Sequence, residues 1–275
     1  MECIERKLLD LLSAEIQAGR IHLPSLPEVA LKVREAVEKE EISAAKLATL
    51  IAEDAALAAR LLQVANSPLY RGRSEITSLQ MAITRMGYNT VRTLLISLAM
   101  KQVFKPTSAL LERHFRVIWH SSVEVAAISR ALASLSPHLN AEEAMLAGLI
   151  HQIGKLPILT LAERNPILRN NPTELERVLD ALHPEVGRLI LNAWQFPKAL
   201  CQVVTEYRNF QRQPEGGGAD YVDLVQVAHL QYLISRDEAL PVDPAQVGAF
   251  ARLGLAPNIE VVELEDLDLT KQLLA

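Results

Sequence analysis

The stretch that decides the fold is Gly148-Leu149-Ile150-His151-Gln152-Ile153-Gly154-Lys155. On a helix, Ala144, Ala147 and Gly148 share one face with His151, because residues three, four and seven positions apart point the same way. Small residues beside a histidine allow another backbone or a ligand to approach closely. The stretch therefore predicts a pocket position for His151 rather than a surface position. A separate apolar face is formed by Leu146, Leu149, Ile150 and Ile153.

The composition of the whole chain favours helices. Hydrophobic residues make up 49 % of the 275 residues and aromatic residues only 4 %, so the core consists mainly of leucine, isoleucine, valine and alanine. Leucine and alanine are strong helix formers. The formal charge is −5, and acidic and basic residues are interspersed, which does not favour a nucleic-acid binder.

Apolar residues recur at helical spacing along nearly the whole chain, and sustained alternation typical of strands is hard to find. Ser43 and Asp54 are predicted N-caps, and Gly19 can end the first helix. The pattern predicts an all-α fold. The expected helices cover residues 4–12, 27–37, 44–52, 55–65, 79–86, 89–104, 110–135, 141–149 and beyond, 184–194, 197–207 and 219–235.

Cys3 and Cys201 are the only cysteines, which is too few for a disulfide framework, and both are expected to be reduced thiols. Cys201 lies in an apolar helix pattern and is expected to be buried. The N-terminus lacks the basic start and apolar stretch of a signal peptide, and no apolar run reaches the roughly 20 residues that span a bilayer. We therefore expect a cytoplasmic protein that does not enter a membrane.

Several dispersed motifs, in the expected order, resemble those of the HDOD family, whose members are non-catalytic relatives of the HD superfamily of metal-dependent phosphohydrolases. The segment from Gly148 to Lys155 is similar to the His-Asp-x-Gly-Lys core of that superfamily, with Gln152 in place of aspartate. The resemblance covers roughly residues 20–235. The other matching segments are 23–27, 47–70, 76–92, Trp119-His120-Ser121, His183-Pro184-Glu185-Val186-Gly187 and Trp194-Gln195-Phe196-Pro197.

The resemblance implies two packed helical subdomains, the second an HD-like bundle. Pro106-Thr107-Ser108 is the best internal boundary, because a helix must end before the proline. The acidic residues 260–268 are expected to form a loosely attached end. The expected units are an N-terminal helix over 1–19, an N-terminal helical part over 20–105, the HD-like bundle over 110–235 and a C-terminal segment over 236–275.

The resemblance also implies a degenerate site. An active HD hydrolase holds metal with a first histidine, the His-Asp pair and a distal aspartate, and both carboxylates are replaced here, by Gln152 and His229. An amide or imidazole lacks the negative charge that suits hard cations. We therefore expect no catalytic residue, no bound metal and no cofactor. The remnant pocket implied by the family is His120, His151, Gln152, Lys155, His183, Glu206 and His229.

One alternative remains open for this pocket. If His120, His151 and His229 converged, the three imidazoles would suit Zn²⁺ and leave a fourth position open. The interpretation that we favour is that these histidines are packed or hydrogen-bonded remnants of an old pocket.

Arg85 and Arg92 form a possible interaction patch in the first half of the chain, where two helices flanking Gly87 imitate a helix-turn-helix. DNA binding needs a more concentrated basic face, so core packing is the favoured interpretation.

The family resemblance implies a bacterial regulatory protein that acts as an adaptor or scaffold. Its implied partners are signalling proteins, including members of cyclic-dinucleotide or two-component pathways, and homo-oligomers are possible. The alternative is a metal-dependent phosphohydrolase acting on a nucleotide or cyclic dinucleotide.

Overall fold

The computed structural model describes residues 23–257 and 266–274 apart from residues 40, 41, 71, 73, 107 and 215, together with residue 14. The predicted helix over 4–12, most of the unit over 1–19, and Cys3 lie outside the described residues. Helices and no strand are found within the described part, which confirms the all-α prediction. The division into units at residue 105 stays a prediction.

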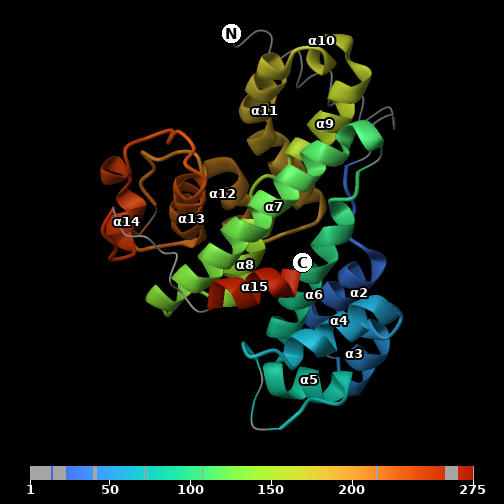
Figure 1. Cartoon of the computed structure of the whole chain (residues 1–275). Coiled ribbons are helices and arrows are strands. Elements are labelled where there is room, and N and C mark those ends of the chain that lie inside the picture. The colour runs from blue at the N-terminus through green and yellow to red at the C-terminus, as the bar shows by residue number, and fades with distance from the viewer. Residues whose placement is uncertain are drawn as a thin grey trace.

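The N-terminal helices gather at one end of the molecule, around α6 (Figure 1). Ser43 and Asp54 cap α3 and α4 as predicted, because their side chains accept hydrogen bonds from backbone N–H groups in the first turns. These helices are α2 (Glu28–Glu38), α3 (Ala44–Ile51), α4 (Ala55–Ala65), α5 (Leu79–Met86) and α6 (Tyr88–Val103).

The centre of the molecule is a helical hairpin formed by α7 (Ala109–Leu132) and α8 (Ala141–Ile150), joined by η1 (Ala133–Leu135). Figure 1 shows this hairpin between the N-terminal helices and the helices that follow it. The later elements are α9 (Lys155–Arg164), α10 (Pro166–Arg169), α11 (Pro172–Ala193), α12 (Lys198–Glu206), α13 (Tyr221–Ser235), η2 (Pro244–Gln246), α14 (Gly248–Arg252) and α15 (Asp266–Leu274).

The prediction of a helix starting at Pro184 was wrong, because α11 runs through this proline from Pro172 to Ala193. An internal proline costs a helix about 3 kcal/mol. Leu179 and Leu182 before the proline and Val186 after it are all buried, and their burial offsets that cost. Cys201, which was expected to be buried, is only partly buried.

Of the acidic residues 260–268, which were expected to form a loosely attached end, 260–265 lie outside the described residues. For residues 266–268 the expectation was wrong, because they begin α15 and Leu267 is buried. Leu273 is buried, and Lys271 Nζ lies 2.6 Å from a carboxylate oxygen of Glu124 on α7. Arg60 on α4 donates a 3.0 Å hydrogen bond to the carbonyl oxygen of Leu273, near the end of the helix. The helix therefore ties an N-terminal helix to the hairpin.

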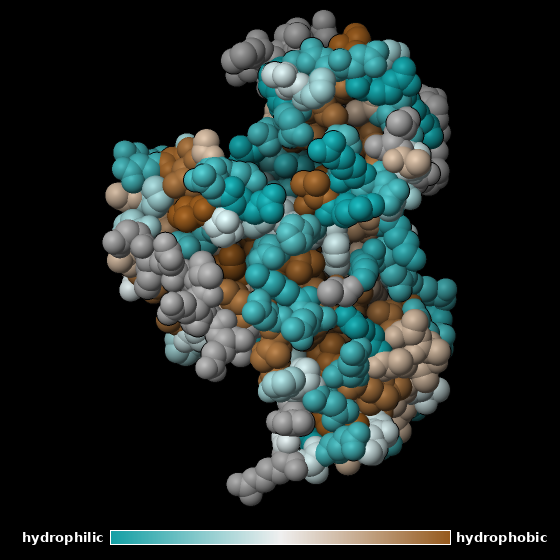
Figure 2. Space-filling model, in the orientation of Figure 1, coloured by the Kyte–Doolittle hydropathy of each residue, from teal (hydrophilic) through white to brown (hydrophobic). Residues whose placement is uncertain are grey.

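The helical stretch Ala141–Arg164, which comprises α8, the turn and α9, is long and apolar enough to cross a membrane by length and composition. However, 89 % of its most apolar part is buried inside the protein. This is the behaviour of a core helix. Figure 2 shows polar side chains over most of the visible face, with apolar ones between the helices and over α3 and α4.

Candidate functional site

Two glycines hold the turn between α8 and α9 against neighbouring helices. A Cβ atom added at Gly148 would lie 2.6 Å from the backbone nitrogen of Ala126 on α7. A Cβ atom added at Gly154 would lie 2.5 Å from the backbone nitrogen of Gly187 on α11. Contacts this short leave no room for a side chain. The close approach predicted beside His151 is therefore present, and it fixes this turn inside the bundle.

Four aromatic side chains from four parts of the chain meet at this turn, and we call them the ring cluster: His151, His183, Tyr207 and His229. Tyr207 is central, because its ring centroid lies 4.9 Å from that of His151, 5.7 Å from that of His183 and 5.4 Å from that of His229. His151 and His183 are fully buried, and Tyr207 is 1 % exposed. A phenol ring thus fills the space between the three imidazoles.

A chain of hydrogen bonds fixes the polar atoms around Tyr207. The Nδ1 atom of His183 lies 2.8 Å from the carbonyl oxygen of Leu179, which can only accept, so Nδ1 carries the proton. His183 Nε2 is therefore an acceptor, and the Tyr207 hydroxyl donates to it over 2.9 Å. The side chain of Gln152 hydrogen-bonds to Tyr207 and favours its ionised form, as an amide N–H donor does. The amide that replaces the family carboxylate thus supports a neutral tyrosine–histidine pair.

His151 and His229 are held differently. His151 Nδ1 lies 2.6 Å from the carbonyl oxygen of Gly148 and donates to it. The other nitrogen of His151, Nε2, and Nδ1 of His229 are both buried and have no hydrogen-bond partner among the described residues. The two ring centroids are 5.8 Å apart. These two imidazoles pack as rings rather than as parts of the hydrogen-bond chain.

The ring cluster is uncharged at neutral pH. Burial lowers the pKa of His183 and of His229 to about 3, and the charge of Lys155 lowers both further. Burial also holds the pKa of His151 well below its usual range, helped by His229 and Lys155. Burial raises the pKa of Tyr207 far above its usual value.

Lys155 gives this region a positive rather than a negative neighbour. Its Nζ atom lies 3.9 Å from Oδ1 of Asp180, and burial lowers its pKa. The same Asp180 oxygen lies 2.6 Å from Arg208, so the carboxylate is shared between two cations. The negative charge of Asp180 is therefore already balanced by these two side chains.

These residues do not fit the metal that the HD superfamily implies. The cluster offers neutral imidazoles separated by a phenol ring, an amide and a nearby ammonium group. Hard divalent cations prefer anionic oxygen ligands. Within the described residues, no group of three or more histidine, cysteine, aspartate or glutamate side chains could hold a metal ion.

His120 lies away from the ring cluster. It is exposed on α7 and lines a separate cavity with Trp119 and Tyr232. The structure therefore does not bring His120, His151 and His229 together, as the zinc alternative requires.

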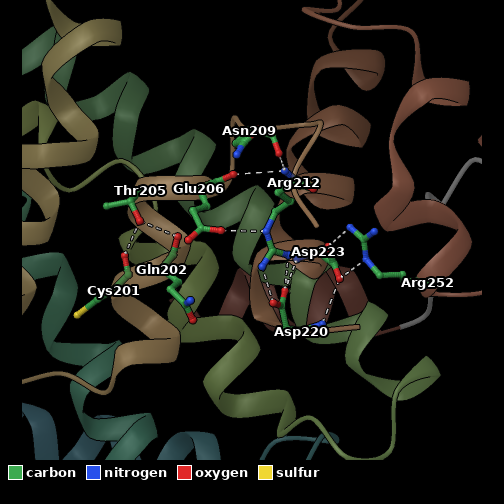
Figure 3. A network of polar contacts seen from close by, with 10 residues as sticks. Cys201, Gln202, Thr205, Glu206, Asn209, Arg212, Asp220, Asp223 and Arg252 are labelled. Carbon is green, nitrogen blue, oxygen red and sulfur yellow. Dashed lines mark hydrogen bonds and ion pairs between the residues drawn. The ribbon is translucent and has the colours of Figure 1, made fainter. Parts of the chain in front are cut away.

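Glu206 precedes Tyr207 but points into a charged network instead of the ring cluster (Figure 3). Its carboxylate lies 3.1 Å from Arg212, which also contacts Asp220 at 2.7 Å and the fully buried Asp223 at 3.0 Å. Arg252 on α14 reaches Asp223 at 2.6 Å. This network joins the segment after α12 to α13 and α14, and so holds Tyr207 in place.

Sequence reasoning missed the central role of Tyr207 and missed this network. One signal was available for the network: Asp220 and Asp223 have the spacing of a capping box, and both capping hydrogen bonds are present at the start of α13.

The predicted interaction patch makes contacts within the chain. Arg85 donates to the carbonyl oxygen of Ser74 at 2.6 Å and to its hydroxyl at 2.9 Å. Arg92 lies 3.8 Å from Glu143 on α8. Beside this pair, the hydroxyl of Tyr70 donates to Glu142 at 3.0 Å. These contacts link the N-terminal helices to the hairpin.

Comparison with known proteins gives relatives over nearly the whole chain. A candidate metal-dependent phosphohydrolase from Shewanella amazonensis SB2B has a crystal structure similar to this fold, with a TM-score of 0.81, 27 % identity, and coverage of 98 % of this chain and 97 % of that chain. A candidate signal transduction protein from Marinobacter aquaeolei VT8 has a TM-score of 0.63 and 18 % identity, covering 99 % of this chain and 64 % of that chain.

Among curated proteins, an uncharacterized protein of Treponema pallidum (strain Nichols) is 24 % identical over 219 residues, which is 74 % of this chain. The match spans only 41 % of that relative's length. The model of the HDOD domain matches residues 23–210, which is more than half of the chain. The chain therefore belongs to the HDOD domain family.

Proposed function

We propose that this chain is a non-catalytic regulatory module of signal transduction, which acts as an adaptor or scaffold by binding proteins or a small ligand. One observation carries the proposal: Tyr207 occupies the centre of the three imidazoles and is hydrogen-bonded to His183 and Gln152. A site that activates water needs an open position and charge to polarise it. This site is filled, uncharged and bordered by a lysine.

Relatives support a signalling role. One relative of the same fold is named as a candidate signal transduction protein. The partners that we propose are bacterial signalling proteins, including members of cyclic-dinucleotide or two-component pathways. We further propose a cytoplasmic location, no membrane or nucleic-acid partner, and self-association as one possible mode of action.

The contacts between the N-terminal helices and the hairpin suit a scaffold. Arg92 reaches Glu143, Tyr70 reaches Glu142, and Arg60 holds the end of α15. Such contacts keep two groups of helices in one arrangement, and a partner that touches both groups meets a preformed surface.

The alternative function is hydrolysis of a nucleotide or cyclic dinucleotide with a bound metal. It is favoured by the 27 % identical relative that is named a candidate metal-dependent phosphohydrolase. This alternative requires the ring cluster to open, because Tyr207 fills its centre.

Two measurements on the same protein test the proposal. The first is turnover of bis-p-nitrophenyl phosphate and of cyclic dinucleotides with added Mn²⁺, Fe²⁺ or Zn²⁺. We expect none above the blank, and turnover that is lost in His151→Asn would establish the enzyme instead.

The second measurement is crosslinking and co-purification from the native host with wild type and His151→Asn. We expect both proteins to retain the same reproducible partners, and the absence of any such partner would contradict the adaptor role.

A further inference from the structure

A cavity of about 410 Å³ lies between α7 and the end of α13, apart from the ring cluster. This volume lies within the range of roughly 300–1,000 Å³ that is usual for small-molecule sites. The residues that carry the argument are Arg116, Val117, Trp119, His120, Tyr232 and Arg236.

The walls of the cavity are aromatic and apolar. Trp119 packs against Phe104 with ring centroids 5.1 Å apart, which holds the indole in place. Tyr232 is 8 % exposed, so its ring forms a firm wall. Val117 is 58 % exposed and adds apolar surface beside these rings. Ordered rings beside an exposed apolar residue favour a flat ligand.

The charge of the cavity is positive. Arg116 and Arg236 line it together with His120, and no acidic residue is among its described lining. Within the described part of the chain, Arg116 pairs with Glu112 at 2.5 Å and Arg236 with Glu238 at 3.7 Å, both at the surface. Exposed pairs of this kind contribute little, so an anion with two or more oxygens can recruit both guanidinium groups.

We propose that this cavity binds a free nucleoside monophosphate. Its base would stack on Trp119 against the wall that Tyr232 forms, and its phosphate would meet Arg116 and Arg236. Base stacking on aromatic rings and guanidinium–phosphate pairing are the usual means of holding a nucleotide without a metal. The cavity has room for one nucleotide. The inference names a ligand class that the proposed function leaves open, and its test is separate from the test of that function because no residue of the ring cluster lines this cavity.

Isothermal titration calorimetry on the full chain tests the inference. The ligands are AMP, GMP, CMP and UMP, with adenosine, guanosine, cytidine, uridine and inorganic phosphate as comparisons. The test variant combines Arg116→Gln with Arg236→Gln, and both arginine side chains are exposed, so their replacement leaves the core intact. The control is Arg188→Gln, another exposed arginine with an ion pair to a nearby glutamate on its own helix, α11.

We expect at least one monophosphate to bind saturably and about tenfold or more tightly than either comparison ligand, because its nucleoside lacks the charge-assisted hydrogen bonds and inorganic phosphate lacks base stacking. The double variant weakens this binding about tenfold or more, and Arg188→Gln leaves it unchanged. No saturable binding, equal binding of inorganic phosphate, or equal binding by the double variant would overturn the inference. Tighter binding of a single-stranded pentanucleotide that requires the same arginines would overturn a free nucleotide as the ligand.

Discussion

The hydroxyl of Tyr207 is the atom on which the neutral ring cluster depends, and Tyr207→Phe removes it alone. The ring remains, so the packing against His151 and His229 is kept. Two hydrogen bonds disappear: the one donated to His183 Nε2 and the one accepted from Gln152. The substitution therefore tests the hydrogen-bond chain separately from the packing.

The size of the effect follows from what is left behind. The buried Nε2 atom of His183 loses its donor, and the largely buried amide of Gln152 loses an acceptor. Leaving a buried polar group without a partner costs about 1–3 kcal/mol. Gln152 is 7 % exposed and can regain part of its loss from water. We therefore expect Tyr207→Phe to lower the free energy of unfolding by about 2–4 kcal/mol.

Urea unfolding at pH 7, followed by far-ultraviolet circular dichroism, measures this change. The matched control is Tyr88→Phe, because Tyr88 is 37 % exposed, and we expect a change within about 0.5 kcal/mol. A double-mutant cycle with Gln152→Leu should give a coupling energy of about 1 kcal/mol between Gln152 and Tyr207. If Tyr207→Phe cost no more than Tyr88→Phe, the hydrogen-bond chain would not exist as described.

Three further predictions concern charge and packing. His183 and His229 take up protons near pH 6.5 when unfolded but only near pH 3 when folded, so stability is lost as the pH falls through this window. His229→Gln should therefore make the pH dependence of urea unfolding shallower by up to about 1.4 kcal/mol per pH unit. An unchanged slope would show that His229 is already charged in the folded protein. Gly148→Ala should lower the free energy of unfolding by about 1–3 kcal/mol, and with it the melting temperature. Gly218→Ala should leave the melting temperature unchanged, because a methyl group there meets open space. Equal effects of the two substitutions would contradict the close helix contact. Arg252→Met should lower the free energy of unfolding, measured with urea, by about 3–5 kcal/mol, because the fully buried carboxylate of Asp223 loses one of its two arginine partners. A decrease below about 1 kcal/mol would show that Arg212 alone is enough to balance this charge.

Much of the fold follows from periodicity in the sequence. The predicted caps at Ser43 and Asp54 are present, and the stretch around His151 is buried against another backbone as its small residues indicate. Local rules failed where packing outweighed them. Pro184 is kept inside α11 by the apolar residues on both sides, and α15 docks through an ion pair to Glu124 that no local pattern reveals.

The candidate site was harder to predict because a motif does not state which way a helix faces. On α7 the buried stripe runs through Phe115, Ile118, Ser122 and Val125, so His120 faces outward. That stripe was readable from the sequence by helical spacing. The meeting of Tyr207 with the histidines was not, because it depends on the folding together of segments far apart in the chain.

The metal content of untagged protein tests the central claim most directly. The protein is incubated with Zn²⁺, Mn²⁺ and Fe²⁺, desalted, and analysed by inductively coupled plasma mass spectrometry, alongside His151→Asn and His183→Asn. The account predicts folded wild-type protein with metal far below one ion per chain and no difference from either variant. Near-stoichiometric metal in the wild type that is lost in either variant would contradict it.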